Sequence, residues 1–298
     1  MLEIKKYAAI DIGSNAIRLL ISNVIIEQEK EPQFKKSSLV RVPIRLGADA
    51  FVSGTISSDN IDRMIDAMKA FQLLMKVHGV EKYKACATSA MREASNGEDI
   101  VKSIKDKTGI EIDVIDGKKE AAIIFSTDLS ELIESDQSYL YVDVGGGSTE
   151  FTIFSKGRII NSKSFKMGTV RLINNKKSEN KVIFKEVQSW IETNTKNIKK
   201  ISLIGSGGNI NKIFKMSGRT IGKPISYIYL NAQYQFLKQM SYKDRISELS
   251  LNPDRADVII PATKIYLSAM KWSGARKVFV PKIGLSDGII KSLYFNKL

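Results

Sequence analysis

A short apolar run followed by Asp, Gly and a hydroxyl residue occurs twice in this chain, and the repeat constrains the fold more than any other feature. The first copy reads YAAIDIGS over residues 7–14, and the second reads YLYVDVGGGS over residues 139–148. Each apolar run predicts a buried strand, and the glycine and serine predict a tight turn at its end. Two copies in a chain of 298 residues indicate two related domains.

The residue types in these turns suit an anionic ligand. Glycine lets the backbone approach a ligand closely, and successive N–H groups in such a turn form a concave anion site. An Asp does not hold phosphate itself, but beside phosphate it can hold a divalent cation. We therefore expect both turns to face one phosphate group across a cleft, although the first also fits a plain hairpin turn. The first predicted phosphate-binding turn contains Asp11, Gly13, Ser14, Asn15 and Arg18.

The second turn, with three successive glycines, gives the strongest signal. Three glycines between two strands cost conformational entropy, so they are unexpected unless the backbone wraps an anion. Asp143 and Glu150 flank the turn and are the predicted ligands of Mg²⁺, because hard carboxylate oxygens beside phosphate suit this ion. The predicted phosphate ligands are Gly145, Gly146, Gly147 and Ser148.

Two segments of the first half follow expected strands and could take part in the same chemistry. Ser89 and Arg92 lie in TSAMREA and could clamp an anion, or could form a helix cap with a surface arginine. Glu120 lies in the first turn of an expected helix. Its carboxylate could orient a water molecule, or it could only complement the helix dipole.

A third glycine turn, GSGG, comes at an expected strand-to-helix junction in the second half. Its glycines are Gly205, Gly207 and Gly208, and such a junction is a secondary anion-binding candidate. The turn is neither a P-loop nor a GxGxxG fingerprint.

The composition limits the chemistry and the partners. The single His78 and the single Cys86 leave too few groups for a zinc site or a Ser–His triad, so catalysis has to depend on carboxylates, a metal ion and fixed positive charge. The formal charge of +14 favours a polyanionic partner, or simply reflects a lysine-rich surface. The lone cysteine, which we expect to be a buried structural thiol, indicates a reducing compartment. No signal peptide or long apolar stretch is evident, so we expect a cytoplasmic protein without membrane contact.

Each half begins with three expected strands and then alternates helices with strands, the pattern of an α/β protein with a mixed sheet in each half. We expect domains over residues 1–125 and 126–298, and a polar loop over residues 174–181. The expected strands cover residues 5–11, 17–26, 34–46, 83–87, 111–115, 139–144, 151–155, 158–165, 201–204 and 277–280. The expected helices cover residues 60–78, 97–107, 118–133, 169–174, 185–197, 207–216, 232–240, 242–249, 255–272 and 286–296.

Taken together, the motifs resemble the exopolyphosphatase / guanosine pentaphosphate phosphohydrolase family (Ppx/GppA) in a short, two-domain form. The resemblance implies two ribonuclease-H-like domains of the actin-like ATPase superfamily around a central cleft, and often a homodimer. It implies that Glu120 positions the attacking water, that Asp143 and Glu150 are associated with Mg²⁺, and that Arg92 and the glycine turns contact phosphate. The similar pieces, in family order, are AAIDIGSNAIRLLI, IRLGADAF, ATSAMREASN, VIDGKKEA, YVDVGGGSTEF, GSGGNI and DRADVIIPA.

The expected function is Mg²⁺-dependent hydrolysis of the terminal phosphoanhydride of inorganic polyphosphate, which releases orthophosphate. An alternative substrate is the 5′ end of guanosine pentaphosphate, whereas nucleic acid is not expected as a substrate. Two other classes stay open: an ATP-dependent kinase of the same superfamily, and a non-catalytic module that binds polyphosphate or a nucleotide. A kinase would need an acceptor, and a binding module would have no need of a water-orienting Glu120.

Overall fold

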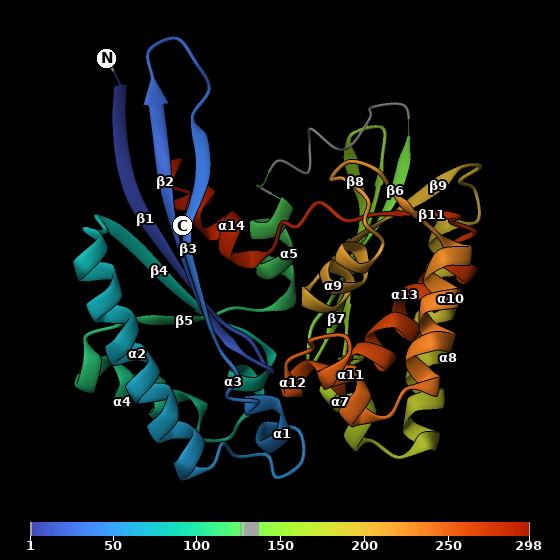
Figure 1. The fold of residues 1–298 in the computed structure, drawn as a ribbon, viewed down its shortest axis with the longest axis horizontal. Coiled ribbons are helices and arrows are strands. Elements are labelled where there is room, and N and C mark those ends of the chain that lie inside the picture. Colours follow the sequence, from blue (N-terminus) through green and yellow to red (C-terminus); the bar gives the residue numbers. More distant parts are fainter. Residues whose placement is uncertain (1, 126, 128–136, 298) are drawn as a thin grey trace. The chain divides into compact units, whose positions relative to one another are not determined.

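The computed structural model describes residues 2–125, 127 and 137–297, and the chain divides into two compact units (Figure 1). The first unit contains residues 1–127 and 284–298, and the second contains residues 128–283. Each unit is built on one mixed sheet with helices packed on it, which confirms the predicted α/β architecture. No helix among the described residues is long and apolar enough to cross a membrane.

The first unit has a five-stranded sheet. Its strands are β1 (Leu2–Ile12), β2 (Ile17–Glu27), β3 (Gln33–Val42), β4 (Lys82–Ala87) and β5 (Ile112–Val114), and its helices are α1 (Leu46–Ala50), α2 (Ser58–His78), α3 (Ser89–Glu93), α4 (Gly97–Thr108), α5 (Gly117–Phe125) and α14 (Leu285–Tyr294). The strand order is β3-β2-β1-β4-β5. The first three strands pair antiparallel because short turns join them, and β4 and β5 run parallel to β1 because helices connect them.

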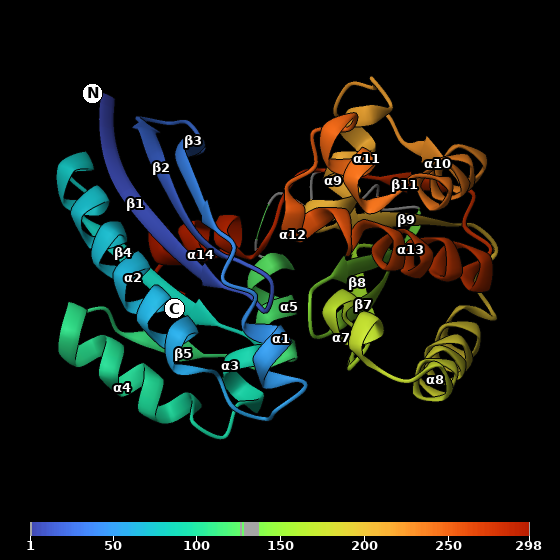
Figure 2. The same ribbon diagram turned by 60° about the horizontal axis from the view of Figure 1, so that its bottom comes forward.

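Helices cover both faces of this sheet (Figures 1 and 2). Alternate residues of β1, such as Ile10 and Ile12, pack with Met68 and Phe71 of α2 in one core cluster. Helix α14 packs against the other face, and α5 packs against α14. Helix α2 ends as predicted, because Gly79 adopts a left-handed conformation (φ 68°) directly after the last helical residue.

The closing helix departs from the predicted domain division. Residues 284–298 belong to the first unit, whereas the sequence reading placed them in the second domain. Helix α14 packs on β1, β2 and β4 and crosses α5 closely, since a Cβ on Gly288 would lie 2.2 Å from the carbonyl oxygen of Ile123. The sequence pattern predicts a helix at this position, but it does not show that the helix packs on the sheet of the first unit.

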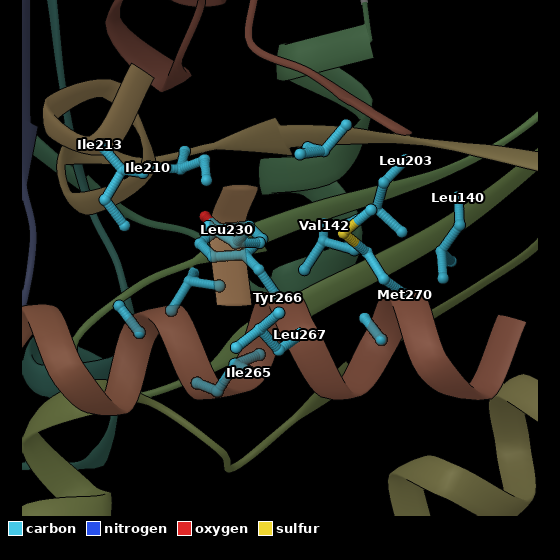
Figure 3. Close-up of a cluster of buried hydrophobic side chains, with 14 of the residues drawn as sticks. Leu140, Val142, Leu203, Ile210, Ile213, Leu230, Ile265, Tyr266, Leu267 and Met270 are labelled. Carbon is cyan, nitrogen blue, oxygen red and sulfur yellow. The ribbon is translucent and has the colours of Figure 1, made fainter. Parts of the chain in front are cut away.

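The second unit has a six-stranded sheet in the order β10-β11-β9-β6-β7-β8. Its strands are β6 (Ser138–Val144), β7 (Thr149–Ser155), β8 (Arg158–Phe165), β9 (Ile201–Ser206), β10 (Ile225–Ser226) and β11 (Lys277–Phe279), and its helices are α7 (Thr169–Asn174), α8 (Lys177–Thr195), α9 (Gly208–Met216), α10 (Tyr227–Gln239), α11 (Tyr242–Ser247), α12 (Pro253–Ala256) and α13 (Ile259–Ser273). Figure 3 shows Val142 of β6 and Leu203 of β9 beside Met270 of α13, within the core of this unit.

The two sheets repeat one topology. Strand β6 pairs antiparallel with β7 and parallel with β9, as β1 pairs with β2 and β4. The register is repeated as well, because Asp11 faces Arg18 across the first hairpin and Asp143 faces Glu150 across the second. The repeat inferred from the two strand-and-turn motifs is therefore a repeat of the fold.

Several element boundaries were predicted wrongly. The third strand ends at Val42 instead of residue 46, and α1 begins at Leu46. The polar loop predicted over residues 174–181 is mostly the start of α8, because the Glu179 side chain accepts a hydrogen bond from the Lys176 backbone N–H (3.2 Å) and caps the helix. The helix expected over residues 255–272 is divided into α12 and α13. Part of the helix expected over residues 118–133 lies outside the described residues.

Candidate phosphate-binding site

The first predicted turn joins β1 to β2 and is closed by a hydrogen bond from the Gly13 N–H to the Ala16 carbonyl (3.1 Å). The Arg18 Nη1 donates to Asp11 Oδ2 at 3.0 Å. Asp11 is buried, and this burial raises the pKa of its carboxyl group, while the positive charge of Arg18 opposes the rise. The ion pair fixes both side chains at the turn. Their predicted roles toward phosphate stay predictions.

Hydroxyl groups tie this turn to the segment after β4. The Ser14 and Ser89 Oγ atoms lie 2.9 Å apart, and both residues are buried. The Thr88 N–H donates to the Ile12 carbonyl at 3.1 Å, so the strand ends also meet through the backbone. The structure thus brings together two of the segments that the sequence singled out.

Arg92 and Glu120 lie at the same edge of the first sheet, because β1, β4 and β5 are parallel and their carboxyl ends share one edge. The Arg92 Nη1 donates to the Ile115 carbonyl at 2.6 Å, next to the start of α5. Asp116 caps that helix through a 2.7 Å hydrogen bond from the Lys119 N–H to its Oδ1. This cap places Glu120, which is partly buried, in the first turn of α5.

In the second unit, two acidic side chains flank the glycine turn. Asp143 and Glu150 are direct cross-strand partners, so their side chains project from the same face of the β6–β7 hairpin. Glu150 is buried, and its Oε1 accepts hydrogen bonds from Ser148 Oγ (2.6 Å) and Ser164 Oγ (2.8 Å). Because the Ser148 hydroxyl donates to Glu150, the group that Ser148 can offer to phosphate is its backbone N–H.

The turn GSGG lies against the glycine turn within the second unit. Asp143 is the register partner of Ser206 on the neighbouring parallel strand. Gly207 has φ 112°, and a Cβ there would lie 3.0 Å from the Val144 carbonyl oxygen and 3.5 Å from Asp143 Oδ1. Glycine at this position is therefore required both by the backbone conformation and by the space left beside Asp143.

Two buried tyrosines surround Asp143. Tyr141 Oη donates to Asp143 Oδ2 at 3.4 Å, and Tyr266 Oη donates to the Ser206 carbonyl oxygen. Burial and then the negative charge of Asp143 raise the pKa of both phenols well above the usual value. Both hydroxyls consequently stay protonated and can act only as neutral groups beside the carboxylate.

The acidic residues of this turn are compatible with Mg²⁺. Within the part of the chain that the structure describes, no group of three or more His, Cys, Asp or Glu side chains could hold a metal ion. Mg²⁺ does not need such a group, because it keeps several water ligands and is commonly bound by one or two carboxylates together with substrate phosphates. The pair of Asp143 and Glu150 at a phosphate-type turn fits this mode of binding.

Cys86 is fully buried on β4, and burial raises the pKa of its thiol to about 12. The thiol therefore stays protonated at neutral pH, and a protonated thiol is a poor nucleophile. This agrees with the prediction that Cys86 has a structural role.

Sequence reasoning missed the segment that follows β8, residues 168–171, which contacts the glycine turn directly. A signal for it exists in the chain. RLGAD at residues 45–49 follows the first three strands, and KMGTV at residues 166–170 follows the second three. Both carry a basic residue, a large apolar residue and a glycine, so the internal repeat extends beyond the strand and turn.

Two α/β units of one topology, each with an acidic residue and a glycine turn at the carboxyl edge of its central strand, define a ribonuclease-H-like fold. The chain belongs to the Ppx/GppA phosphatase family, since the sequence model of that family matches residues 25–296. The family is one of phosphatases, so the chain is a member of a hydrolase family. The cleft expected between the domains stays a prediction.

Individual relatives agree with this assignment. Exopolyphosphatase 2 of Mycobacterium tuberculosis is 24% identical over 319 residues, which cover 97% of this chain and 98% of the relative. A bifunctional 3-dehydroquinate synthase/phosphatase of Fusobacterium nucleatum is 30% identical over 92% of this chain, but the chain spans only 44% of its length. The crystal structure of an exopolyphosphatase from Cytophaga hutchinsonii superposes with a TM-score of 0.86 at 25% identity and covers 98% of both chains. The Aquifex aeolicus family member, with a TM-score of 0.78 at 23% identity, has the same fold over 99% of both chains.

Proposed function

We propose that the protein hydrolyses the terminal phosphoanhydride of inorganic polyphosphate and releases orthophosphate. The glycine turn at residues 145–148, flanked by the cross-strand pair of Asp143 and Glu150, carries this proposal. The names of two relatives that this chain covers almost from end to end, the Mycobacterium and Cytophaga exopolyphosphatases, support it. A cytoplasmic location and a homodimer stay predictions.

In this proposal the site residues bind the phosphate, neutralise its charge and orient the attacking water. The backbone N–H groups of the glycine turn and the Arg92 guanidinium bind the terminal phosphoryl group, because its non-bridging oxygens are anionic acceptors. Glu120 accepts a hydrogen bond from water and directs its oxygen toward phosphorus. Mg²⁺ held by Asp143 and Glu150 would offset negative charge on the phosphate oxygens. Phosphoryl transfer depends mainly on such positioning and neutralisation, so the side chains need form no covalent bond to the substrate.

Phosphate release is the direct test of this function. The purified protein is incubated with Mg²⁺ and with polyphosphate of several chain lengths, and in parallel with guanosine pentaphosphate, without any phosphate acceptor. We expect orthophosphate to appear from polyphosphate at a rate proportional to enzyme concentration. Release from guanosine pentaphosphate alone would replace the proposed substrate. Release from neither substrate, with transfer only to an added acceptor, would contradict hydrolysis.

The affinity for polyphosphate is expected to fall steeply with salt, and more steeply for long chains than for short ones. The formal charge of +14 attracts a polyanion, and each phosphate neutralised by Lys or Arg releases bound counterions, a gain that added salt removes. The measurement is the dissociation constant between low and physiological salt at two chain lengths. An affinity independent of salt at both lengths would show that the basic surface takes no part in binding.

A further inference from the structure

The carbonyl oxygens of the three glycines in the glycine turn all accept hydrogen bonds from one segment, residues 169–171. The Thr169 N–H donates to the Gly145 carbonyl (3.0 Å), and the Val170 N–H donates to the Gly146 carbonyl (2.9 Å). The Gly147 carbonyl accepts from a side chain, the Nε of Arg171, at 2.7 Å. Three successive carbonyl groups therefore point toward the start of α7.

These bonds fix the direction of the N–H groups in the turn. In a planar trans peptide the carbonyl of one residue and the N–H of the next point in opposite directions. The N–H groups of Gly146, Gly147 and Ser148 follow the three bonded carbonyls, so they are directed away from α7. Three adjacent N–H groups with a common direction are the arrangement that binds an anion.

The close approach of α7 depends on Gly168. A Cβ on Gly168 would lie 2.2 Å from the Gly146 carbonyl oxygen and 2.3 Å from the Gly147 carbonyl carbon. Any side chain at this position would separate the segment from the turn and break the bonds that orient it. Arg171, only partly buried, contributes the last of these bonds through its side chain rather than its backbone.

The first unit contains the same arrangement of a turn and a glycine-containing segment hydrogen-bonded to its carbonyl groups. The segment that leads into α1 lies against the first turn, where the Gly47 N–H donates to the Ser14 carbonyl (2.7 Å) and the Arg45 N–H donates to the Asn15 carbonyl (3.1 Å). A Cβ on Gly47 would lie 3.0 Å from the Ser14 Cβ. In each unit, N–H groups at the start of the helix after the third strand thus donate hydrogen bonds to carbonyl groups of the turn between the first two strands.

We propose that Arg171 is a positioning residue for the phosphate-binding turn: by holding the Gly147 carbonyl, it directs the Ser148 N–H toward the terminal phosphate. This inference rests on the proposed function of the turn. Arg171 acts through the backbone that it bonds, together with the segment that begins at Gly168. A merely structural role would change stability alone, whereas a positioning role changes the affinity for phosphate while the fold is retained.

The test compares Arg171→Ala with the wild-type protein in two assays. In the first, KM for polyphosphate and the inhibition constant of inorganic phosphate are measured. We expect both to rise by about 10- to 100-fold, the effect of weakening a hydrogen bond to a charged group, while kcat falls less. Added guanidinium is expected to restore part of the affinity of this variant and to leave the wild-type protein unchanged. The second assay follows backbone amide hydrogen exchange in residues 143–150 with and without inorganic phosphate. Phosphate should slow exchange in the wild-type protein and not in the variant.

Two further variants, one control and one conservative replacement, complete the experiment. Arg219→Ala removes an exposed arginine of the same unit that lies outside the site, and it should match the wild-type protein in both assays. Arg171→Lys carries the test if Arg171→Ala does not fold, and it should show intermediate phosphate affinity because its donor differs in position from Nε. Phosphate affinity and protection equal to wild type in a folded Arg171 variant would overturn the inference. If the wild-type protein releases no phosphate from polyphosphate, but inorganic phosphate still protects the turn only when Arg171 is present, the proposed function fails and the inference stands.

Discussion

Replacement of Glu120 by Gln is expected to lower kcat by about 10²- to 10⁴-fold, the usual contribution of a positioned acid–base group. Gln has nearly the shape of Glu but no basic carboxylate, so it can occupy the first turn of α5 without activating a water molecule. The affinity for polyphosphate should change little, because the proposed partner of Glu120 is the attacking water and not the phosphate chain. Steady-state phosphate release and direct binding of polyphosphate, measured on the same preparation, separate the two effects.

A matched control and a contrasting variant sharpen this experiment. Glu98 also lies in the first turn of a helix of the first unit, α4, and is exposed, so Glu98→Gln should have wild-type activity. Arg92→Ala should raise KM as well as lower kcat, since a guanidinium that binds the phosphoryl group acts on the bound substrate too. Thermal melting establishes that each variant is folded. A folded Glu120→Gln protein with near-normal turnover would place the base elsewhere.

Removal of divalent cations is expected to lower phosphate release by more than about 100-fold, and Mg²⁺ is expected to restore it, because the several kcal/mol with which a metal ion stabilises charge would be lost. This prediction is based on the pair of carboxylates at the glycine turn. One of them, Glu150, accepts hydrogen bonds from two serine hydroxyls. Excess chelator followed by titration with Mg²⁺ measures the effect.

The variant Asp143→Asn links that requirement to this turn. It keeps the size of the side chain and removes its charge, so the Mg²⁺ concentration needed for half-maximal activity should increase. Full activity in excess chelator, or an unchanged Mg²⁺ requirement in a folded Asp143→Asn protein, would exclude the proposed role of these acids.

Apolar runs that end in turn residues predicted the strands best, because β1, β6 and β7 are buried along most of their length. Both hairpins, both central strands and the parallel strand after α2 were found this way. Elements held by capping or by distant contacts were missed. Helix α8 begins in a run that looks like a loop because its first turn depends on Glu179, and α14 was assigned to the wrong domain because only its packing on β1 shows where it belongs.

In the candidate site, too, residues with a local sequence signal were predicted, and residues whose role depends on tertiary contacts were missed. The second glycine turn stands out in the sequence because three successive glycines are more than a hairpin turn needs. Gly168 and Arg171 do not stand out, since their importance arises from a close approach to residues 145–147 that only the folded chain reveals. The direction of the Ser148 hydroxyl, toward Glu150, is also a property of the assembled hairpin, and it leaves the backbone N–H as the group that Ser148 can offer to phosphate.

The most direct test of the proposed reaction is hydrolysis of polyphosphate of defined length in ¹⁸O-labelled water, without any acceptor. Attack of water on the terminal phosphorus predicts that each released orthophosphate carries one ¹⁸O atom from the solvent and that the remaining chains shorten one unit at a time from their ends. Mass spectrometry of the orthophosphate and of the residual chains measures both quantities. Release of unlabelled phosphate, cleavage into chains of intermediate length, or no release until an acceptor is added would each contradict hydrolysis of the terminal phosphoanhydride.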